Sequence, residues 1–275
     1  MENTITREQL SAKIVEQLML HSGSLSQYWQ TSQPVRHFYL DDILPKEWAM
    51  ECFNALPDPA ILLERNSIKE RKRVGIKLEN YNALVGAILF AFQDKRVMEI
   101  VSEITGCKNL HSDESLYGSG VSIMIEDDFL MPHLDNSHDG DGEEYRVLNA
   151  LYYISPEWKT EDGGNLELWD TSMNNRKEIT AKFNRLIMME TNTTSIHSVN
   201  KVRKENGVRA CISNYYFSQQ PTGGKSYIHK TTFFARPEDG AIKKLILFAE
   251  ATAKKIFSGF ITNKVKKTKH RRDKS

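Results

Sequence analysis

The feature that most constrains this fold is a series of β-type segments between about residues 116 and 220. They are rich in β-branched and aromatic residues and read VSIMI, RVLNALYYI, GGNLELWD, RLIMME and VRACISNYYFS. Turn sequences such as SPEW, EDGG and KENG separate them, and no helical pattern lies between them. Strands without intervening helices cannot form parallel βαβ units, so the sequence predicts an antiparallel sandwich or barrel.

Helical patterns flank this β core on both sides. Before it, a short strand is expected at 35–42, and helices are expected over residues 6–21, 45–55, 81–93 and 95–105. After it, a helix over residues 240–262 has an apolar side that includes Leu245, Phe248, Ile256 and Phe260. We expect this side to pack on the barrel, with a membrane surface as the alternative. Because we find no repeat or linker, we expect a single domain over residues 1–262.

The composition is that of a globular protein with a buried core, since 40% of the residues are apolar and 27% are charged. No apolar run approaches the roughly 20 residues of a membrane span. The N-terminal sequence lacks the pattern of a secretory signal. Three scattered cysteines are typical of free thiols in a reducing compartment, so we expect a cytoplasmic protein.

The net charge of +1 hides an uneven distribution. Residues 264–275 hold seven of the 37 Lys and Arg residues and one of the 36 Asp and Glu residues, which leaves a mildly acidic body. We interpret residues 263–275 as a basic, flexible tail. An electrostatic contact with anionic lipid at the inner face of a membrane is a second interpretation, and the acidic body argues against a nucleic-acid-binding module.

Three side chains in the β region have the chemistry of a metal site. His133 and Asp135 follow a strand at positions i and i+2, so both point to the same side of an extended chain. His197, on another predicted strand, can supply a third ligand. Two imidazoles and one carboxylate leave coordination positions open and suit non-heme Fe(II), whereas zinc more often takes a closed tetrahedral set. The His-x-Asp pair alone has a high false-positive rate.

The motifs around this triad occur in a specific order. They read PHLD (132–135), ALYYISPEW (150–158), DGGNLELW (162–169), FNRLIMME (183–190), SIHSV (195–199) and RACISNYYF (209–217). This order resembles that of the prolyl-4-hydroxylase-like branch of the Fe(II)/2-oxoglutarate-dependent dioxygenases, in particular its small bacterial-type members. The resemblance implies a mainly β fold with a double-stranded β-helix (jelly-roll) core packed by N- and C-terminal helices.

The resemblance also implies a role for individual positions. His133, Asp135 and His197 match the iron ligands. Arg209 matches the residue that pairs with the distal carboxylate of 2-oxoglutarate, a contact that suits the two-pronged geometry of a guanidinium. Ser213 matches a hydroxyl that supports the same carboxylate. The remaining cosubstrate-pocket positions are matched by Tyr153, Asn149, Leu166, Val199 and Tyr215.

Two nearby sequences compete with these assignments. His138-Asp139-Gly140 has the pattern in which the metal-binding carboxylate is replaced to admit halide, but it lies in an acidic turn where we expect solvent exposure. With Asp135 present, hydroxylation is favoured over halogenation. Arg203 is the rival anchor for the cosubstrate. It lies in the polar turn KVRKENG, whereas Arg209 begins a strand, so Arg209 is favoured. Some relatives carry a cosubstrate-binding tyrosine before the His-x-Asp pair, and residues 121–123 show no counterpart.

The resemblance implies a hydroxylase that uses Fe(II), 2-oxoglutarate and O2, is helped by ascorbate, and releases succinate and CO2. We interpret the substrate as a small metabolite or a sugar- or lipid-linked molecule. Basic segments at 68–80 and 227–239, the latter with His229, Lys230 and Arg236, would suit an anionic one if they lie at the pocket mouth. The alternatives are ordinary solvated charge, a hydroxylase of prolyl residues with a groove for an extended peptide, and a non-catalytic sensor of metal or 2-oxoglutarate.

Overall fold

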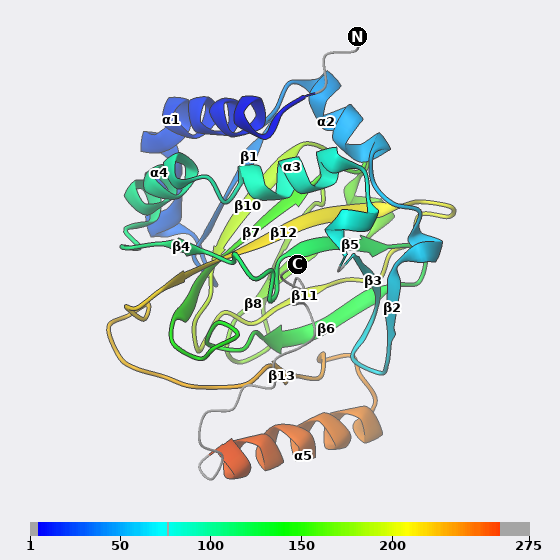
Figure 1. Cartoon of the computed structure of the whole chain (residues 1–275). Helices are drawn as coiled ribbons and strands as arrows, with labels where there is room; N and C mark the ends of the chain where they lie inside the picture. Colours follow the sequence, from blue (N-terminus) through cyan, green and yellow to red (C-terminus); the bar gives the residue numbers. More distant parts are fainter. Residues whose placement is uncertain (1–4, 76, 259–275) are drawn as a thin grey trace.

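The computed structural model describes residues 5–75 and 77–258 (Figure 1). The predicted basic tail and the final part of the predicted C-terminal helix lie outside these residues. The helices are α1 (Arg7–Thr31), α2 (Lys46–Asn54), α3 (Ala83–Ala91), α4 (Lys95–Thr105) and α5 (Ala241–Ser258), with short 3-10 turns at Pro59–Ile61, Leu78–Asn80 and Thr160–Asp162. No helix among the described residues has both the length and the apolar character needed to cross a membrane.

The strands form one curled antiparallel sheet. In chain order they are β1 (His37–Asp41), β2 (Leu63–Asn66), β3 (Glu70–Gly75), β4 (His111–Ser112), β5 (Gly120–Met124), β6 (Phe129–Leu134), β7 (Tyr145–Tyr153), β8 (Leu166–Trp169), β9 (Arg176–Ile179), β10 (Arg185–Glu190), β11 (His197–Val199), β12 (Arg209–Ser218) and β13 (Thr232–Phe233). Their spatial order is β1-β10-β7-β12-β5-β3-β6-β11-β8-β9. The predicted double-stranded β-helix is thereby confirmed.

Strand β3 is what joins the two halves of this sheet. It pairs with β5 through Arg73–Gly75 and with β6 through Glu70 and Arg71. The half that contains β12 and the half that contains β11 therefore curve toward each other around one interior (Figure 1). This curvature brings strands that are distant in sequence to the same cavity.

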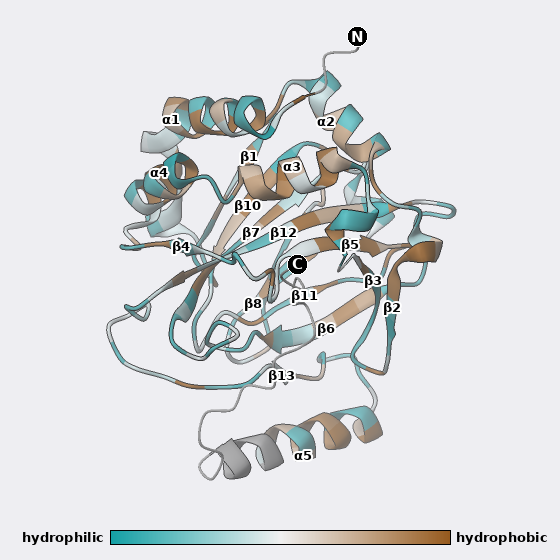
Figure 2. Ribbon diagram, viewed as in Figure 1, coloured by the Kyte–Doolittle hydropathy of each residue, from teal (hydrophilic) through white to brown (hydrophobic). Residues whose placement is uncertain are grey.

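The main core lies between the N-terminal helices and the outer face of the β12 half (Figure 1). Successive residues of β7 and β12 face this core and the interior in turn, and these strands carry both apolar and polar residues (Figure 2). Tyr152, Ile212 and Tyr216 face the helices and are fully buried. The helices thus hold the sheet from outside and leave its inner face free.

Helix α1 is longer than predicted. It begins at a capping box made by Thr6 and Gln9, but it continues to Thr31 instead of residue 21. The segment after residue 21 is polar and contains a glycine, so its helical spacing of apolar residues is not evident in the sequence. Its buried residues Leu25 and Trp29 nevertheless continue the apolar stripe, and tertiary packing sustains the helix.

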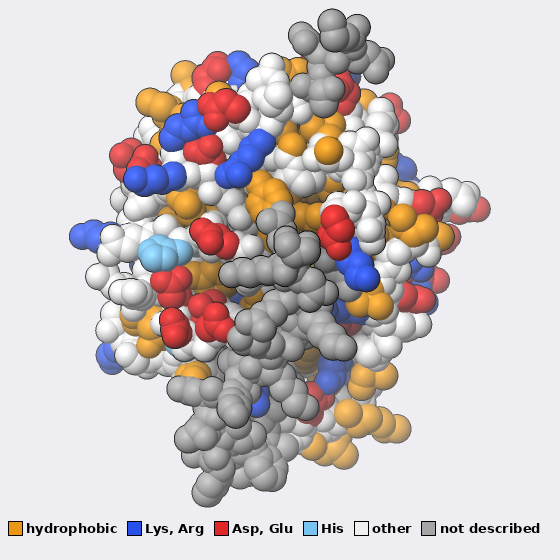
Figure 3. Space-filling model, viewed as in Figure 1, with side chains coloured by type: hydrophobic (Ala, Val, Ile, Leu, Met, Phe, Trp, Pro, Cys, Tyr) orange, Lys and Arg blue, Asp and Glu red, His pale blue; other side chains and the backbone are white. Residues whose placement is uncertain are grey.

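The expectation that the apolar side of the C-terminal helix packs on the barrel is wrong for its described residues. The side chains of Leu245 and Phe248 are 68% and 71% exposed, and Leu247 on the other side is the buried one at 2%. Helix α5 lies along the β13 segment, at the lower edge of the molecule in Figure 1, and Lys69 contacts Glu250 at 2.6 Å. Its predicted apolar side therefore lines an open surface, where Figure 3 shows hydrophobic side chains gathered at the lower right.

A buried histidine in the core predicts acid sensitivity. Burial lowers the pKa of His37 from 6.5 to about 4; its hydrogen bond to the Val35 oxygen opposes this shift, and the charge of Lys177 adds to it. Because the folded-state pKa is the lower one, the unfolded chain takes up the proton first. His37 therefore adds stability above pH 6.5 that is lost as the pH falls toward 4.

We expect His37 to account for about 2 kcal/mol of the loss in unfolding free energy between about pH 7 and pH 5. The measurement is urea unfolding at both pH values for the wild type and for His37→Asn, which keeps a donor for the Val35 oxygen but does not titrate. The variant is expected to show a flatter profile. Equal slopes in the two proteins would contradict the assignment.

Candidate active site

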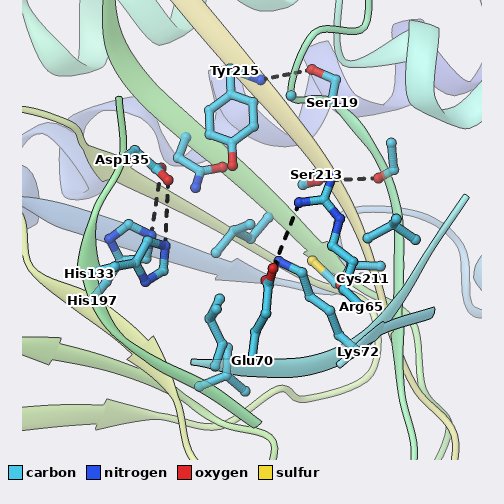
Figure 4. Close-up of a pocket in the computed structure, with 18 of the residues that line it drawn as sticks. Arg65, Glu70, Lys72, Ser119, His133, Asp135, His197, Cys211, Ser213 and Tyr215 are labelled. Carbon is cyan, nitrogen blue, oxygen red and sulfur yellow. Dashed lines mark hydrogen bonds and ion pairs between the residues drawn. The ribbon is translucent and has the colours of Figure 1, made fainter. Parts of the chain in front are cut away.

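Three side chains with metal-binding atoms meet inside the barrel (Figure 4). His133 and Asp135 lie at the end of β6, and His197 begins β11 directly opposite His133. Nε2 of His133 is 3.5 Å from Asp135 Oδ1, and Nε2 of His197 is 3.7 Å from Asp135 Oδ2. Among the described residues they form the one group of three His, Cys, Asp or Glu side chains whose ligand atoms all lie within 4.8 Å of one another.

Both imidazole rings present the same nitrogen to the centre of the triad. Nδ1 of His133 lies 2.9 Å from the backbone oxygen of Met131, and Nδ1 of His197 lies 3.0 Å from that of Ser195. A carbonyl oxygen can only accept, so each Nδ1 carries a hydrogen and donates it. The Nε2 lone pairs are then directed at the centre, and the outer hydrogen bonds fix the two rings.

The protonation states of the triad also suit a divalent ion. Burial lowers the pKa of His197 to about 4, with a contribution from His133. Burial alone would raise the pKa of Asp135, but the close approach of His133, with His197 and the Arg146 guanidinium nearby, holds it well below its usual range. Asp135 Oδ2 is buried and accepts no hydrogen bond from the described residues. A neutral imidazole, an ionised carboxylate and an unsatisfied oxygen are the features that Fe(II) requires of its ligands.

A cavity of about 430 Å³ extends from the triad to Arg209. Arg209 is buried at the start of β12; its Nε donates to the Gly164 oxygen at 3.0 Å, and Nη2 donates to the Tyr153 hydroxyl at 3.1 Å. Gly163 and Gly164 have φ values of +73° and +65°, and a Cβ on Gly164 would lie 3.0 Å from Cγ of Arg209. The double glycine therefore makes room for the guanidinium and orients it.

The other predicted cosubstrate positions line the same cavity: Asn149, Tyr153, Leu166, Val199, Ser213 and Tyr215. Ser213 Oγ donates to the Gly120 oxygen at 3.2 Å. Tyr152, the neighbour of Tyr153, points away into the helix-covered core and donates to Asn184. The structure brings the predicted residues together, and their contacts with a cosubstrate stay predictions.

Several cavity residues were missed by the sequence prediction, and Arg146 is the clearest case. The alternation of β7 places Asn149, Leu151 and Tyr153 inward, and so would place Arg146 outward. The register shifts next to Val147, so that Arg146 pairs with Phe217 and faces the cavity. A bulge of this kind leaves no signal in the alternation. Further cavity residues outside the predicted site include Arg65, Glu70, Lys72, Tyr117, Asn136, Cys211 and Phe233.

Arg146 shapes the site around Asp135. Its Nη1 lies 3.6 Å from Asp135 Oδ2, and its guanidinium stacks 3.9 Å from the centre of the Tyr215 ring. Tyr117, four residues before the segment 121–123 that lacks a tyrosine, lines the cavity. The walls beside the triad are thus aromatic and cationic.

The two rival motifs lie away from the cavity lining. Arg203 donates to the backbone oxygens of Glu161 and Thr160 on an exposed turn. His138 is not solvent-exposed as expected: it is buried, its Nδ1 pairs with the Ser137 hydroxyl at 2.7 Å, and its ring packs on Tyr145. The acidic turn folds back over this ring, which is why the polar sequence around it was misleading.

The basic segment 227–239 does not gather its cations at the cavity. Nη1 of Arg236 contacts the buried Glu167 carboxylate at 2.5 Å, and Nη2 lies 3.3 Å from the Val199 oxygen. Arg236 therefore ties the C-terminal segment to β8 and β11 and is absent from the lining of the cavity. His229 and Lys230 line a separate groove beside α5.

Comparisons with known proteins agree with this geometry. The sequence profile of the 2OG-Fe(II) oxygenase superfamily matches residues 119–217. The prolyl 3-hydroxylase OGFOD1 of Mus musculus is 30% identical over 105 residues, which cover 36% of this chain and 18% of the mouse protein. The match therefore spans less than a fifth of the length of that curated relative.

Solved structures show the same fold at low sequence identity. A prolyl-4-hydroxylase of Pseudomonas putida has a TM-score of 0.51 at 14% identity, over 70% of this chain and 98% of that one. A prolyl hydroxylase of Trichoplax adhaerens, in complex with a peptide of hypoxia inducible factor, has a TM-score of 0.51 at 19% identity, over 74% and 90%. The profile match and the triad thus identify residues 119–217 as a 2OG-Fe(II) oxygenase domain, and the solved structures show that its fold extends over most of the chain.

Proposed function

We propose that this protein hydroxylates a prolyl residue of a polypeptide, with Fe(II), 2-oxoglutarate and O2. The observation that carries the reaction type is the His133–Asp135–His197 triad facing Arg209 across one cavity. The mouse relative, itself a prolyl 3-hydroxylase, favours a polypeptide substrate over the small metabolite that the sequence alone favoured.

Different side chains of the cavity would bind the metal and the cosubstrate. His133, Asp135 and His197 would hold the iron, which with 2-oxoglutarate and O2 supplies the oxidising power for C–H hydroxylation. Arg209 would bind the distal carboxylate of 2-oxoglutarate and so direct its keto acid end toward the triad. Phe233 stacks on the His133 ring at 5.3 Å and would limit access of water to a metal held by the triad.

A groove next to the cavity supports a polypeptide substrate. It has a volume of about 1320 Å³, three times that of the cavity, and runs between segment 227–235 and α5. Leu245 and Phe248 are among its apolar lining residues. Phe233 lines both the groove and the cavity, so an extended chain in the groove passes next to the metal site. A small metabolite would need no such surface.

We expect peptides with a central proline and apolar flanking residues to accelerate succinate formation and to gain one oxygen atom by mass spectrometry. Matched peptides with alanine at the central position are the control. Leu245→Asp is expected to raise the KM for the peptide about tenfold through lost apolar contact, with the slow peptide-independent turnover unchanged. Leu20→Asp, at an exposed leucine on α1, is the matched control for the variant.

Acceleration by a pool of small metabolites but by none of the peptides would contradict the substrate class. If the loaded protein bound 2-oxoglutarate but formed no succinate under any condition, the sensor alternative would replace the enzyme. Each result leads to a different function for the same triad.

A further inference from the structure

A cluster of three charged residues enters the cavity from the β2–β3 hairpin (Figure 4). Lys72 Nζ lies 2.9 Å from the Glu70 carboxylate, and Arg65 Nη1 lies 3.8 Å from it. All three line the cavity, whereas their neighbours Arg71 and Arg73 bind Asp128 instead. The interior therefore receives two cations and one anion from a hairpin outside the matched region 119–217.

The sheet register places Lys72 beside Arg209. On β5, Met124 is opposite Arg209, and Ile123 is opposite Arg73. The next residue along β3, Lys72, thus continues the row that contains Met124 and Arg209. Adjacent strands are about 4.8 Å apart, so the backbones of Lys72 and Arg209 are separated by about 10 Å. Both long side chains can reach a carboxylate that lies between them.

The surrounding electrostatics agree with this placement. Burial raises the pKa of the Cys211 thiol to about 11, and the charges of Arg209 and Lys72 both oppose that rise. Burial would also raise the pKa of Glu70, but Lys72, Arg65 and His133 together lower it. Figure 4 shows Glu70 between the metal triad and the two cations, where Lys72 contacts its carboxylate.

We propose that Lys72 is a second cation for the distal carboxylate of 2-oxoglutarate, and that Glu70 holds it in place until the cosubstrate enters. The proposal rests on the proposed function for the identity of the cosubstrate. Arg65 is opposite Lys72 in the β2–β3 register and already approaches Glu70, so it can replace Lys72 as the partner of Glu70. The Glu70 carboxylate is then never left unpaired in the cavity.

The test is calorimetric titration of 2-oxoglutarate into the full chain loaded with Mn(II), which binds without turnover. We expect Lys72→Met to raise the Kd about tenfold, the effect of losing one charge-assisted hydrogen bond. Lys77→Met removes an equal charge from an exposed position outside the cavity lining and is expected to leave the Kd unchanged. Glu70→Gln is expected to lower the Kd several-fold, and this gain should shrink when Lys72 is also replaced.

A second ligand separates a direct contact from a structural effect. 2-Oxobutyrate lacks the distal carboxylate, so its Kd is expected to be the same for the wild type and Lys72→Met. The proposal is overturned if Lys72→Met matches Lys77→Met, or if it weakens both ligands equally. Failure of the wild type to bind 2-oxoglutarate at all would overturn the proposed function as well, whereas normal wild-type binding with an unchanged variant overturns this proposal alone.

Discussion

Asp135→Ala is expected to abolish metal binding and to reduce succinate formation by a factor on the order of 1000 or more. Asp135 supplies the one anionic ligand, and its buried Oδ2 has no hydrogen-bond partner among the described residues. Without this carboxylate the protein supplies no anionic ligand, so the two imidazoles compete much less well with water for Fe(II). The measurement is Mn(II) affinity by electron paramagnetic resonance, together with succinate formation from 2-oxoglutarate with Fe(II), ascorbate and oxygen.

Two further variants make this result specific. Removal of Asp135 also leaves Arg146 without its carboxylate neighbour, so Asp135→Asn, which keeps the shape of the side chain, serves as the variant least disturbing to the fold. His138→Ala changes a buried histidine three residues away that belongs to the rival motif, and it is expected to keep metal affinity near that of the wild type. Strong metal binding in Asp135→Asn, or its loss in His138→Ala alone, would mean that the triad is misassigned.

Arg209→Met is expected to raise the Kd for 2-oxoglutarate about 100-fold while metal affinity is retained. The guanidinium is buried, held by the Gly164 oxygen and the Tyr153 hydroxyl, and faces the cavity that leads to the triad. Without it the distal carboxylate has lost its two-pronged partner in a water-poor site, which is why the effect is large. The measurement is titration of 2-oxoglutarate into the Mn(II)-loaded protein.

Arg203→Met is the matched control, because it removes the same charge from a surface turn six residues earlier. Its Kd for 2-oxoglutarate is expected to equal that of the wild type. A loss of binding in Arg203→Met with normal binding in Arg209→Met would reverse the choice between the two anchors.

The parts of the site that the sequence predicts are those governed by local periodicity. Residues two apart on a strand share a face, and this rule alone places His133 with Asp135 and separates Tyr153 from Tyr152. Strand β10 begins and ends as its apolar run predicts, at residues 185–190. These features depend on a few residues that are neighbours in the sequence, so they can be predicted without knowledge of the fold.

The parts that the sequence does not predict depend on long-range pairing. Arg146 faces the cavity because of a register shift against β12, and Lys72 does so because β3 inserts between two strands that follow it by some fifty residues. Which face of α5 is exposed depends on the segments that the helix packs against, and the apolar pattern of the helix does not predict it. In each case the residue type is visible in the sequence, but its partner is not.

The position of β3 between β5 and β6 also determines how this protein can be dissected. The recognisable motifs lie within residues 119–217, yet β5 and β6 each pair with β3 in the described structure, and Glu167 receives Arg236 from beyond the last motif. A fragment trimmed to the motifs would expose two bare strand edges and strip a buried carboxylate of one counter-ion. The segment that the superfamily profile matches is thus shorter than the segment whose strands and ion pairs hold together, and a fragment that keeps the metal site must start before residue 70 and end after residue 236.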